Sequence, residues 1–370
     1  MDELDLALVN ALQHDPRAPW ARLARPLGVD AATLSRRWAR LSASGEAWVT
    51  SSAAPSQLDY GAFALVEVGC LPGANQRIAA EVAADPCAGS VEHTTGNRDL
   101  LLTVSAMSVA AVSEYVLDRV GRIDGVTFTR THLSHRLHRE ASRWRLDSLS
   151  QDQRRDLERG AAAGGGQEPG PLREDEVAVL LALAPDGRRS HAALAAELGL
   201  SEARVRRALT GMLSSGRAVL RCEAAHWLAG WRVTGMLWLN VPPPRLRAVA
   251  DAIATMREAR MVCSVVGRAN LMVNVWVHGM RELAAFQARL ASLYPEIRIV
   301  EQSVTLKWVK RVGRLLDGEG RSVGCVPLDP RQTSPAVLGR PSGQRPQSLP
   351  EGRPATKSPT APASRSTGRL

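Results

Sequence analysis

Residues 96–104 read GNRDLLLTV, and residues 267–275 read GRANLMVNV. Each stretch places a glycine turn directly before an apolar run, and the two begin 171 positions apart (267 − 96). The acid Asp99 of the first stretch is replaced by the amide Asn270 in the second. The pair therefore indicates a repeated unit in which one turn has lost its carboxylate.

The same offset of 171 residues continues without a gap toward the N-terminus, where residues 8–28 align with residues 179–199. Solenoid repeats have periods of about 20 to 50 residues, so a repeat this long predicts duplication of a whole two-domain unit. The matching positions in these segments include Leu12 and Leu183, Arg17 and Arg188, and Gly28 and Gly199.

The first part of each unit has helical periodicity. In LDLALVNALQHDPRAPWARLARPLGVDAATLSRRWARLSASG (4–45), apolar residues recur at intervals of three and four and predict three short helices. Gly28 provides a left-handed end for the second helix, and Asp30 provides an N-cap for the third. A helix, a short turn with glycine and another helix is typical of a helix-turn-helix.

The second part of each unit alternates with period two. It predicts the order βαββαβ, the split βαβ arrangement of ferredoxin-like folds. The predicted elements of the first copy cover 62–69, 74–85, 89–95, 99–106, 109–120 and 125–133, and those of the second cover 234–241, 245–256, 261–267, 270–277, 282–293 and 296–304.

The predicted fold class is therefore α+β, with two copies of a winged-helix-like helix-turn-helix domain, each followed by a ferredoxin-like domain. Between the copies, LERGAAAGGGQEPGP (157–171) reads as a flexible linker. The predicted boundaries are a DNA-binding domain at 1–52, an effector and dimerisation domain at 58–140, a linker at 141–172, a second helix-turn-helix at 173–223, a second effector domain at 229–312, and a disordered basic tail at 313–370.

The third helix of each unit is the candidate DNA reader. If the stripe of Leu34, Trp38 and Leu41 is buried, the outer face carries a hydroxyl and guanidinium groups suited to guanine edges and phosphates. The alternative to a DNA-binding face is a basic face that only contacts solvent. In the second copy this face also carries small residues, and we expect weaker binding there. The predicted DNA contacts are Thr33, Arg36, Arg37, Arg40, Arg204, Arg206 and Arg207.

Composition excludes several classes of protein. The five cysteines form no CxxC pair, and no apolar run reaches the roughly 20 residues of a membrane span, so we expect a cytoplasmic protein without disulfides or membrane contact. The net charge is +10, and residues 313–370 hold nine Lys or Arg against four Asp or Glu.

The sequence gives no clear metal site or catalytic site. On a strand, His132 and His138 would point to one face and His135 to the other, which is poor geometry for binding a single metal ion. The familiar catalytic motifs are missing, which predicts no enzyme activity and no cofactor.

In order and spacing, these elements resemble the Lrp/AsnC family of feast/famine regulators. Residues 4–45 resemble its DNA-binding domain, and TTGNRDLLLTVSA (94–106) resembles the turn of its RAM effector domain. The resemblance implies binding to double-stranded DNA and to a small effector such as an amino acid, at the nucleoid, by a homo-oligomer or an intrachain pseudo-dimer. It implies effector positions at Gly96, Asp99, Gly267 and Asn270, with the Asp99 site the better sensor.

Two alternatives stay open. Siroheme decarboxylases resemble the same two-domain unit and occur as fused pairs, but the basic stretch expected after their third helix is replaced here by Trp48-Val49-Thr50-Ser51 and Val219-Leu220-Arg221-Cys222. A degenerate regulator that acts only through protein contacts is the other alternative.

Overall fold

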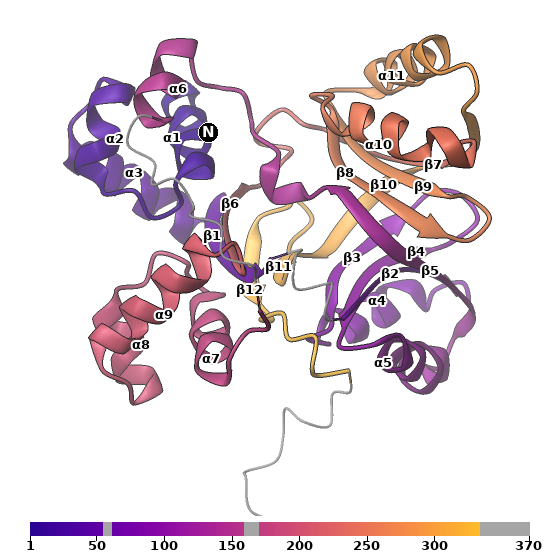
Figure 1. The fold of residues 1–370 in the computed structure, drawn as a ribbon, viewed down its shortest axis with the longest axis horizontal. Coiled ribbons are helices and arrows are strands. Elements are labelled where there is room, and N and C mark those ends of the chain that lie inside the picture. The colour runs from indigo at the N-terminus through magenta and orange to yellow at the C-terminus, as the bar shows by residue number, and fades with distance from the viewer. Residues whose placement is uncertain (55–60, 159–169, 334–370) are drawn as a thin grey trace, which may run out of the picture. The chain divides into compact units, whose positions relative to one another are not determined.

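The computed structural model describes residues 1–54, 61–158 and 170–333, and all of these lie within one compact unit. Two helical domains lie beside a large closed sheet in this unit (Figure 1). Most of the predicted glycine-rich linker and the tail from residue 334 onward lie outside the described residues. None of the helices in the described part is long and apolar enough to cross a bilayer.

The first helical domain forms as its periodicity predicts. Asp2 begins the first helix with a capping box that includes Asp5, and Gly28 ends the second helix with φ of 68°. The apolar stripes meet in a buried core that includes Leu12, Leu23 and Leu34. The helices are α1 (Glu3–His14), α2 (Trp20–Leu27) and α3 (Ala31–Ala43).

The second helical domain repeats the first. Gly199 ends its second helix with φ of 63°, and Ser201 caps the third through its side-chain oxygen. Its core is separate and includes Leu183, Leu194 and Leu209. The helices are α7 (Glu174–Leu183), α8 (His191–Leu198) and α9 (Glu202–Ser214).

A strand follows each third helix, and the two strands pair with each other. β1 (Ala47–Ala53) and β6 (Ala218–Ala224) form a two-stranded antiparallel sheet, with Val49 opposite Cys222. We call these two strands the wing strands. They join the two helical domains through backbone hydrogen bonds, a pairing that the sequence does not predict (Figure 1).

Each βαββαβ unit forms an antiparallel sheet, β3-β4-β2-β5 in the first copy and β8-β9-β7-β10 in the second. The first copy contains β2 (Ala62–Cys70), α4 (Asn75–Ala83), β3 (Ala88–Thr94), β4 (Leu100–Ala106), α5 (Val109–Glu114) and β5 (Val126–Arg139). The second contains β7 (Val233–Asn240), a 3-10 turn (Pro243–Arg245), α10 (Leu246–Ala254), β8 (Ala259–Val266), β9 (Leu271–Val277), α11 (Met280–Leu293) and β10 (Arg298–Arg311). The helix predicted at 109–120 continues after α5 as a π-helical turn (Tyr115–Arg119) and a 3-10 turn (Val120–Arg122).

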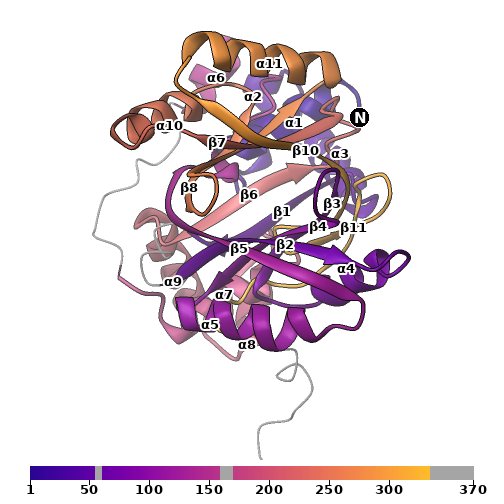
Figure 2. The same cartoon turned by 90° about the vertical axis from the view of Figure 1, so that its right-hand side faces the viewer.

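The two sheets close into one eight-stranded barrel. The last strand of each copy pairs with the second strand of the other copy, β5 with β8 and β10 with β3. Helices α4 and α5 pack outside the first sheet, and α10 and α11 outside the second (Figure 2). Because strand side chains alternate, every second residue points inward. The interior holds Leu65, Leu101, Met236, Trp238, Cys263, Val265, Ala269 and Met272.

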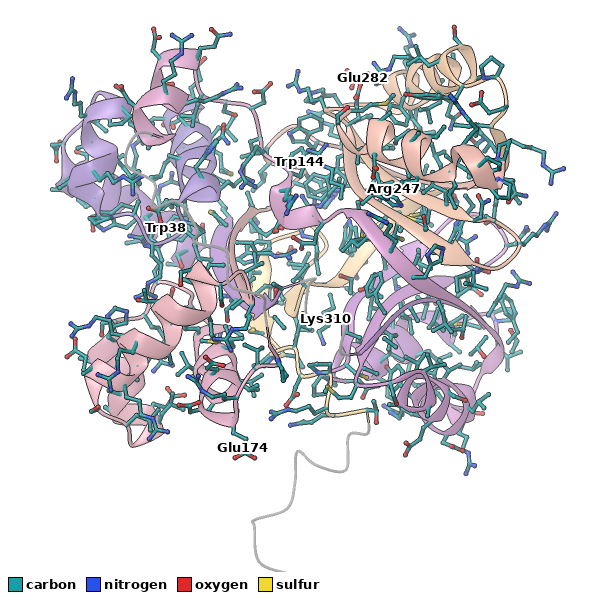
Figure 3. All side chains as sticks on the ribbon, viewed as in Figure 1. Trp38, Trp144, Glu174, Arg247, Glu282 and Lys310 are labelled. Atoms are coloured by element: carbon teal, nitrogen blue, oxygen red, sulfur yellow. The ribbon has the colours of Figure 1, made fainter. Side chains whose placement is uncertain are left out.

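The prediction of a linker at 141–172 is wrong over the first half of the segment, which is folded. It begins with a 3-10 turn (Ala141–Arg143), and α6 (Gln151–Glu158) packs on α2. Trp144 is buried between the first helical domain and the second copy's sheet (Figure 3), with its ring 4.9 Å from that of Trp231. The segment is polar and has no strong periodicity, so its scattered apolar anchors gave no local signal.

The predicted start of the tail at residue 313 is also wrong. β11 (Arg314–Leu316) pairs with the end of β10, and β12 (Ser322–Cys325) pairs with β11. Ser322 donates its backbone N–H to the carbonyl of Gly45, which lies between α3 and β1 of the first copy. These contacts depend on an exposed strand edge, which short-range sequence patterns do not show.

Candidate nucleic-acid interface and effector turns

Helix α3 presents the predicted polar face. Asp30 accepts hydrogen bonds from the Thr33 backbone N–H at 2.8 Å and from the Thr33 hydroxyl at 2.7 Å, which fixes the start of the helix. Leu34, Trp38 and Leu41 are buried, as the periodicity predicts. Trp38 points into the helical domain (Figure 3). The face opposite these residues is therefore the one open to a ligand.

The arginines of α3 differ in their partners. Arg37 pairs with Asp2 at 2.7 Å and with Asp5 at 2.9 Å, and Arg40 pairs with Asp5 at 2.6 Å. The hydrogen bond from Arg37 lowers the pKa of Asp2. In the described chain no carboxylate forms an ion pair with Arg36, which is exposed and donates to the Thr33 hydroxyl at 3.0 Å. Arg36 is thus the α3 guanidinium most available to a base edge.

Helix α9 presents a second basic face. Arg204 pairs with Asp175 at the start of α7, with Nη2 at 3.2 Å from the carboxylate oxygen. Arg206 and Arg207 are exposed, and within the described residues neither forms an ion pair. The second face therefore keeps two arginines without carboxylate partners, although small residues surround them.

The wing strands hold the two helical domains together. Besides the ladder between β1 and β6, the Thr50 hydroxyl donates to Ala184 O at 2.9 Å and the Ser51 hydroxyl donates to Leu180 O at 2.7 Å. These bonds run from the first copy's wing strand to α7 of the second copy. The two candidate readers, α3 and α9, consequently belong to one connected structure.

The two turn residues Asp99 and Asn270 occupy equivalent structural positions. The Asp99 carboxylate accepts the backbone N–H of Cys70 at 2.8 Å. The Asn270 amide accepts the N–H of Val241 at 3.0 Å and donates to the carbonyl of the same residue at 2.7 Å. Each side chain thus closes the end of the first strand of its own sheet. The amide does so with one more hydrogen bond than the acid.

The glycines of both turns lie against the last strand of the other copy. Gly96 has φ of 98°, and a Cβ there would lie 3.5 Å from Glu301 Oε1. At Gly267 a Cβ would lie 2.6 Å from His132 Nδ1, so that a larger residue would displace the imidazole ring. The structure therefore brings the four predicted effector positions to the junctions between the two copies.

A buried ionic cluster between these turns has no counterpart in the predictions from sequence. Arg98, whose side chain has no exposed surface, pairs with Glu67 and with Glu301. His132 lies 3.2 Å from Glu67. Burial alone would raise the pKa of Glu67, but the His132 hydrogen bond and the charge of Arg98 lower it overall. Arg98 stands inside the quoted turn, yet its partner Glu301 is 203 residues away.

The three histidines of the run do not converge. His132 is buried against Glu67, while His138 contacts Asp251 at 2.6 Å and Ser264 at 2.8 Å. His135 is exposed. Among the described residues there is no group of three His, Cys, Asp or Glu side chains that could hold a metal ion.

Comparison with known proteins agrees with this architecture. An AsnC-type helix-turn-helix domain matches residues 1–42, and the Lrp/AsnC ligand-binding domain matches residues 63–143 and 234–315. The HTH-type transcriptional regulator FL11 of Pyrococcus horikoshii is 27% identical over 143 residues, which are 38% of this chain and 94% of the relative. An uncharacterized HTH-type transcriptional regulator of Pyrococcus furiosus is 30% identical over 145 residues, 38% of this chain and 96% of the relative.

Among solved structures, the siroheme decarboxylase NirDL has a similar fold. It superposes with a TM-score of 0.54 at 14% identity, over 86% of this chain and 94% of that chain. The fold and the two faces define a duplicated helix-turn-helix protein with ligand-binding domains. The chain belongs to the Lrp/AsnC family of transcriptional regulators.

Proposed function

We propose that the chain is a sequence-specific DNA-binding regulator that carries two readers, α3 and α9, in one polypeptide and responds to a small molecule such as an amino acid. The observation that supports this most directly is the exposed Arg36, held beside Thr33 on a capped helix and free of ion pairs with described carboxylates. An arginine in this position suits bidentate contact with guanine in the major groove.

The proposal includes an intrachain pseudo-dimer. Both copies supply edge strands to the same barrel, so the chain pairs two effector domains without a second molecule. Two readers on one chain suit half-sites on successive faces of the duplex, roughly 34 Å apart. The other proposed DNA contacts are Thr33, Arg37, Arg40, Arg204, Arg206 and Arg207, and the protein would act at the nucleoid.

The effector positions proposed from the resemblance are Gly96, Asp99, Gly267 and Asn270. Their support is their place at the junction of the two copies, where a bound molecule would contact both. An effector shifts the placement of the readers only as far as its affinities for the two arrangements differ.

The test is selection of binding sites from a random duplex library, with wild type and Arg36→Ala compared by electrophoretic titration. Wild type should enrich a defined motif. Arg36→Ala should lose about 1 to 3 kcal/mol of binding free energy and relax preference at one position, as a base-contacting arginine does. Uniform weakening on all sequences would assign Arg36 to phosphate contact, and failure of wild type to enrich any motif would reject the proposal.

The fold shared with NirDL supports a second candidate, an enzyme that acts on a tetrapyrrole. A bound tetrapyrrole is coloured, so the absorbance spectrum of the purified protein distinguishes the two candidates. We expect a spectrum without a visible band, together with motif enrichment in the library selection.

A further inference from the structure

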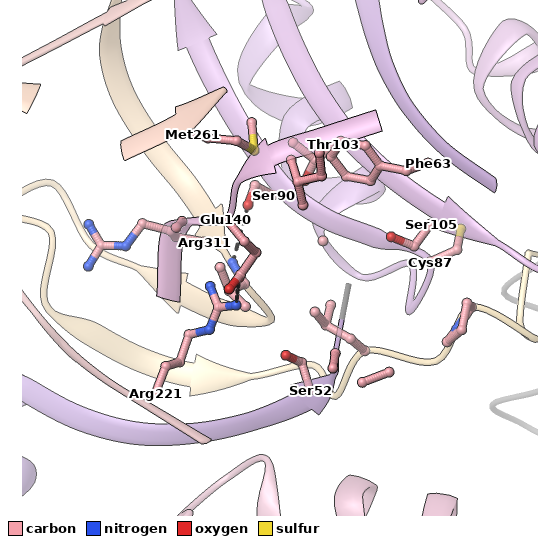
Figure 4. A pocket seen from close by; sticks show the side chains of 18 of the residues that line it. Ser52, Phe63, Cys87, Ser90, Thr103, Ser105, Glu140, Arg221, Met261 and Arg311 are labelled. Atoms are coloured by element: carbon pink, nitrogen blue, oxygen red, sulfur yellow. Dashed lines mark hydrogen bonds and ion pairs between the residues drawn. The ribbon is translucent and has the colours of Figure 1, made fainter. Parts of the chain in front are cut away.

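A cavity of about 200 Å³ lies where the wing strands meet one end of the barrel. Ser52 and Arg221 of the wing strands line it on one side, and Phe63, Thr103 and Met261 of the barrel line it on the other (Figure 4). It is distinct from the turns at 96–99 and 267–270, which contribute no residue to it. An engineered protein cavity of about 150 Å³ holds benzene, so this space suits a molecule of amino-acid size.

The divergence of the two copies accounts for the cavity. Gly89 and Ser105 line it, and the residues 171 positions later are Arg260 and Trp276. In the second copy Arg260 stacks on Trp276, with its guanidinium carbon 3.8 Å from the ring centroid. The first copy thus leaves open the space that the second copy fills with an arginine and an indole. Leaving such a space empty costs stability, which favours a role for it.

The cavity wall carries an excess of buried positive charge. Arg221, Arg260 and Arg311 all line it, and each is at most 7% exposed. Glu223 accepts both hydrogen bonds of Arg260, at 2.6 and 2.8 Å, and lies 3.5 Å from Arg311. Arg221 pairs with Glu140. Three guanidinium groups therefore face two carboxylates.

Two of these arginines keep an unused donor. Among the described residues, the Nε atoms of Arg221 and Arg311 are buried without a hydrogen-bond partner. A third carboxyl group, Glu92, also lines the cavity, but burial raises its pKa to about 7, so near neutral pH it offsets the positive charge only in part. An unpaired buried donor on a cation is costly, and a carboxylate is the acceptor with which a guanidinium group forms its strongest hydrogen bonds.

Most of the remaining wall is apolar. A ligand that fits both parts has a hydrophobic body and a single negative group. The apolar side chains include Phe63, Met107, Leu137, Met236, Met261 and Val312.

We infer that this cavity binds a small monocarboxylate with an apolar body, with its carboxylate at Arg221 and Arg311 and its body between Phe63 and Met261. The inference deepens the effector part of the proposed function, and only its coupling to DNA rests on that function. Because Arg221 belongs to a wing strand, occupancy of the cavity bears on the strands that hold the two readers together.

The test is titration calorimetry on the full chain with phenylacetate and 4-methylpentanoate, each compared with its neutral amide. Both carboxylates should bind, and the amides should bind about tenfold more weakly or worse, since a charged hydrogen bond is lost. Equal binding of acid and amide, or no binding of either acid, would overturn the inference.

Two variants should change the affinity for phenylacetate in opposite directions. Arg221→Gln should weaken it about tenfold, because the charged donor is removed. Glu140→Gln should tighten it, because the carboxylate that competes for Arg221 is lost. Unfolding curves confirm that both variants are folded, and weaker binding in a folded Glu140→Gln would contradict the placement of the carboxylate at Arg221.

Ser105→Trp places in the first copy the indole that the second copy has at Trp276, and it should abolish binding. Ser105→Phe is a smaller filling change with the same expected result, and Ser105→Thr is the matched control that should retain binding. Cooperative thermal unfolding identifies the variants that are folded. Binding that persists in a folded, filled variant would place the ligand elsewhere.

Electrophoretic DNA titration with and without phenylacetate separates this inference from the proposed function. A chain that binds the carboxylates but no DNA would reject the regulator and support the cavity. A chain that binds a DNA motif but neither carboxylate would reject the cavity alone.

Discussion

Arg17 and Arg188 stand 171 positions apart in the sequence and make the same contact in opposite directions. Arg17 donates to Gly187 O at 2.7 Å and to Arg189 O at 2.8 Å, while Arg188 donates to Pro16 O at 2.6 Å and to Ala18 O at 3.0 Å. Each guanidinium thus binds the turn between the first two helices of the other copy. The exchange joins the two helical domains in addition to the pairing of the wing strands.

Arg17→Ala should lower the free energy of unfolding by about 2 kcal/mol, because two charged hydrogen bonds to half-buried carbonyls are lost. Urea unfolding measures this change. Arg25→Ala, on the exposed face of α2, removes the same charge and should leave stability within about 0.5 kcal/mol of wild type. Equal losses in the two variants would mean that charge, not the contact between copies, is responsible.

Asp5→Asn should increase the affinity of the chain for DNA. Asp5 is buried and holds both Arg37 and Arg40, so its loss frees positive charge on α3. The slope of log K against log salt should steepen by about 1, as for one added phosphate contact. Glu3→Gln makes the same charge change at an exposed position of the same helical turn. A similar steepening in Glu3→Gln would exclude a specific role for Asp5.

Asp99→Asn and Asn270→Ala should differ in two measurements. Asn270→Ala removes two hydrogen bonds from Val241 and should cost about 1 to 2 kcal/mol of stability, whereas Asp99→Asn keeps an acceptor for Cys70. The response of DNA binding to an amino-acid panel should instead weaken more in Asp99→Asn. If the panel acts equally on both variants, the turn at 96–99 is not the better sensor.

Glu92→Gln should flatten the dependence of stability on pH. Burial raises the pKa of Glu92 from 4.5 to about 7, so the folded chain binds a proton that the unfolded chain releases. The stability linked to this proton is full below pH 4.5 and is lost as pH rises toward 7, by about 3 kcal/mol.

Chemical unfolding of wild type and Glu92→Gln at pH 4.5, 5.5, 6.5 and 7.5 measures the difference. The variant is compared with wild type, because burial also raises the pKa of Asp85 and makes the stability of both proteins depend on pH. Parallel curves for wild type and variant would show that Glu92 ionises at an ordinary pH.

The structure bears out the elements predicted from periodicity, usually within a few residues. The predicted strand at 62–69 is β2, and the predicted helix at 282–293 lies within α11. The longest shortfalls are at strand ends: β5 and β10 each extend several residues beyond the prediction, to Arg139 and Arg311. These extensions pair with strands of the other copy, and that pairing depends on distant edges rather than local pattern.

The candidate site was predictable only in part. The buried stripe of α3 placed Thr33 and Arg36 correctly on the open face, because side-chain direction on a helix follows from spacing. The pairing of Arg37 and Arg40 with Asp2 and Asp5 was not predicted. It depends on how α1 packs across α3, which spacing within either helix does not reveal.

The sequence by itself determined the duplication, the order of elements in each copy and the family to which they belong. These follow from periodicity, caps and turns, which act over a few residues. Only the tertiary structure decided that the wing strands pair, that the two sheets close into one barrel, and that the space at Gly89 and Ser105 stays open. Backbone hydrogen bonds at a strand edge depend little on residue type, so local sequence does not reveal which edges pair. The walls of the cavity come from residues that lie far apart in the chain, so no local pattern reveals the cavity.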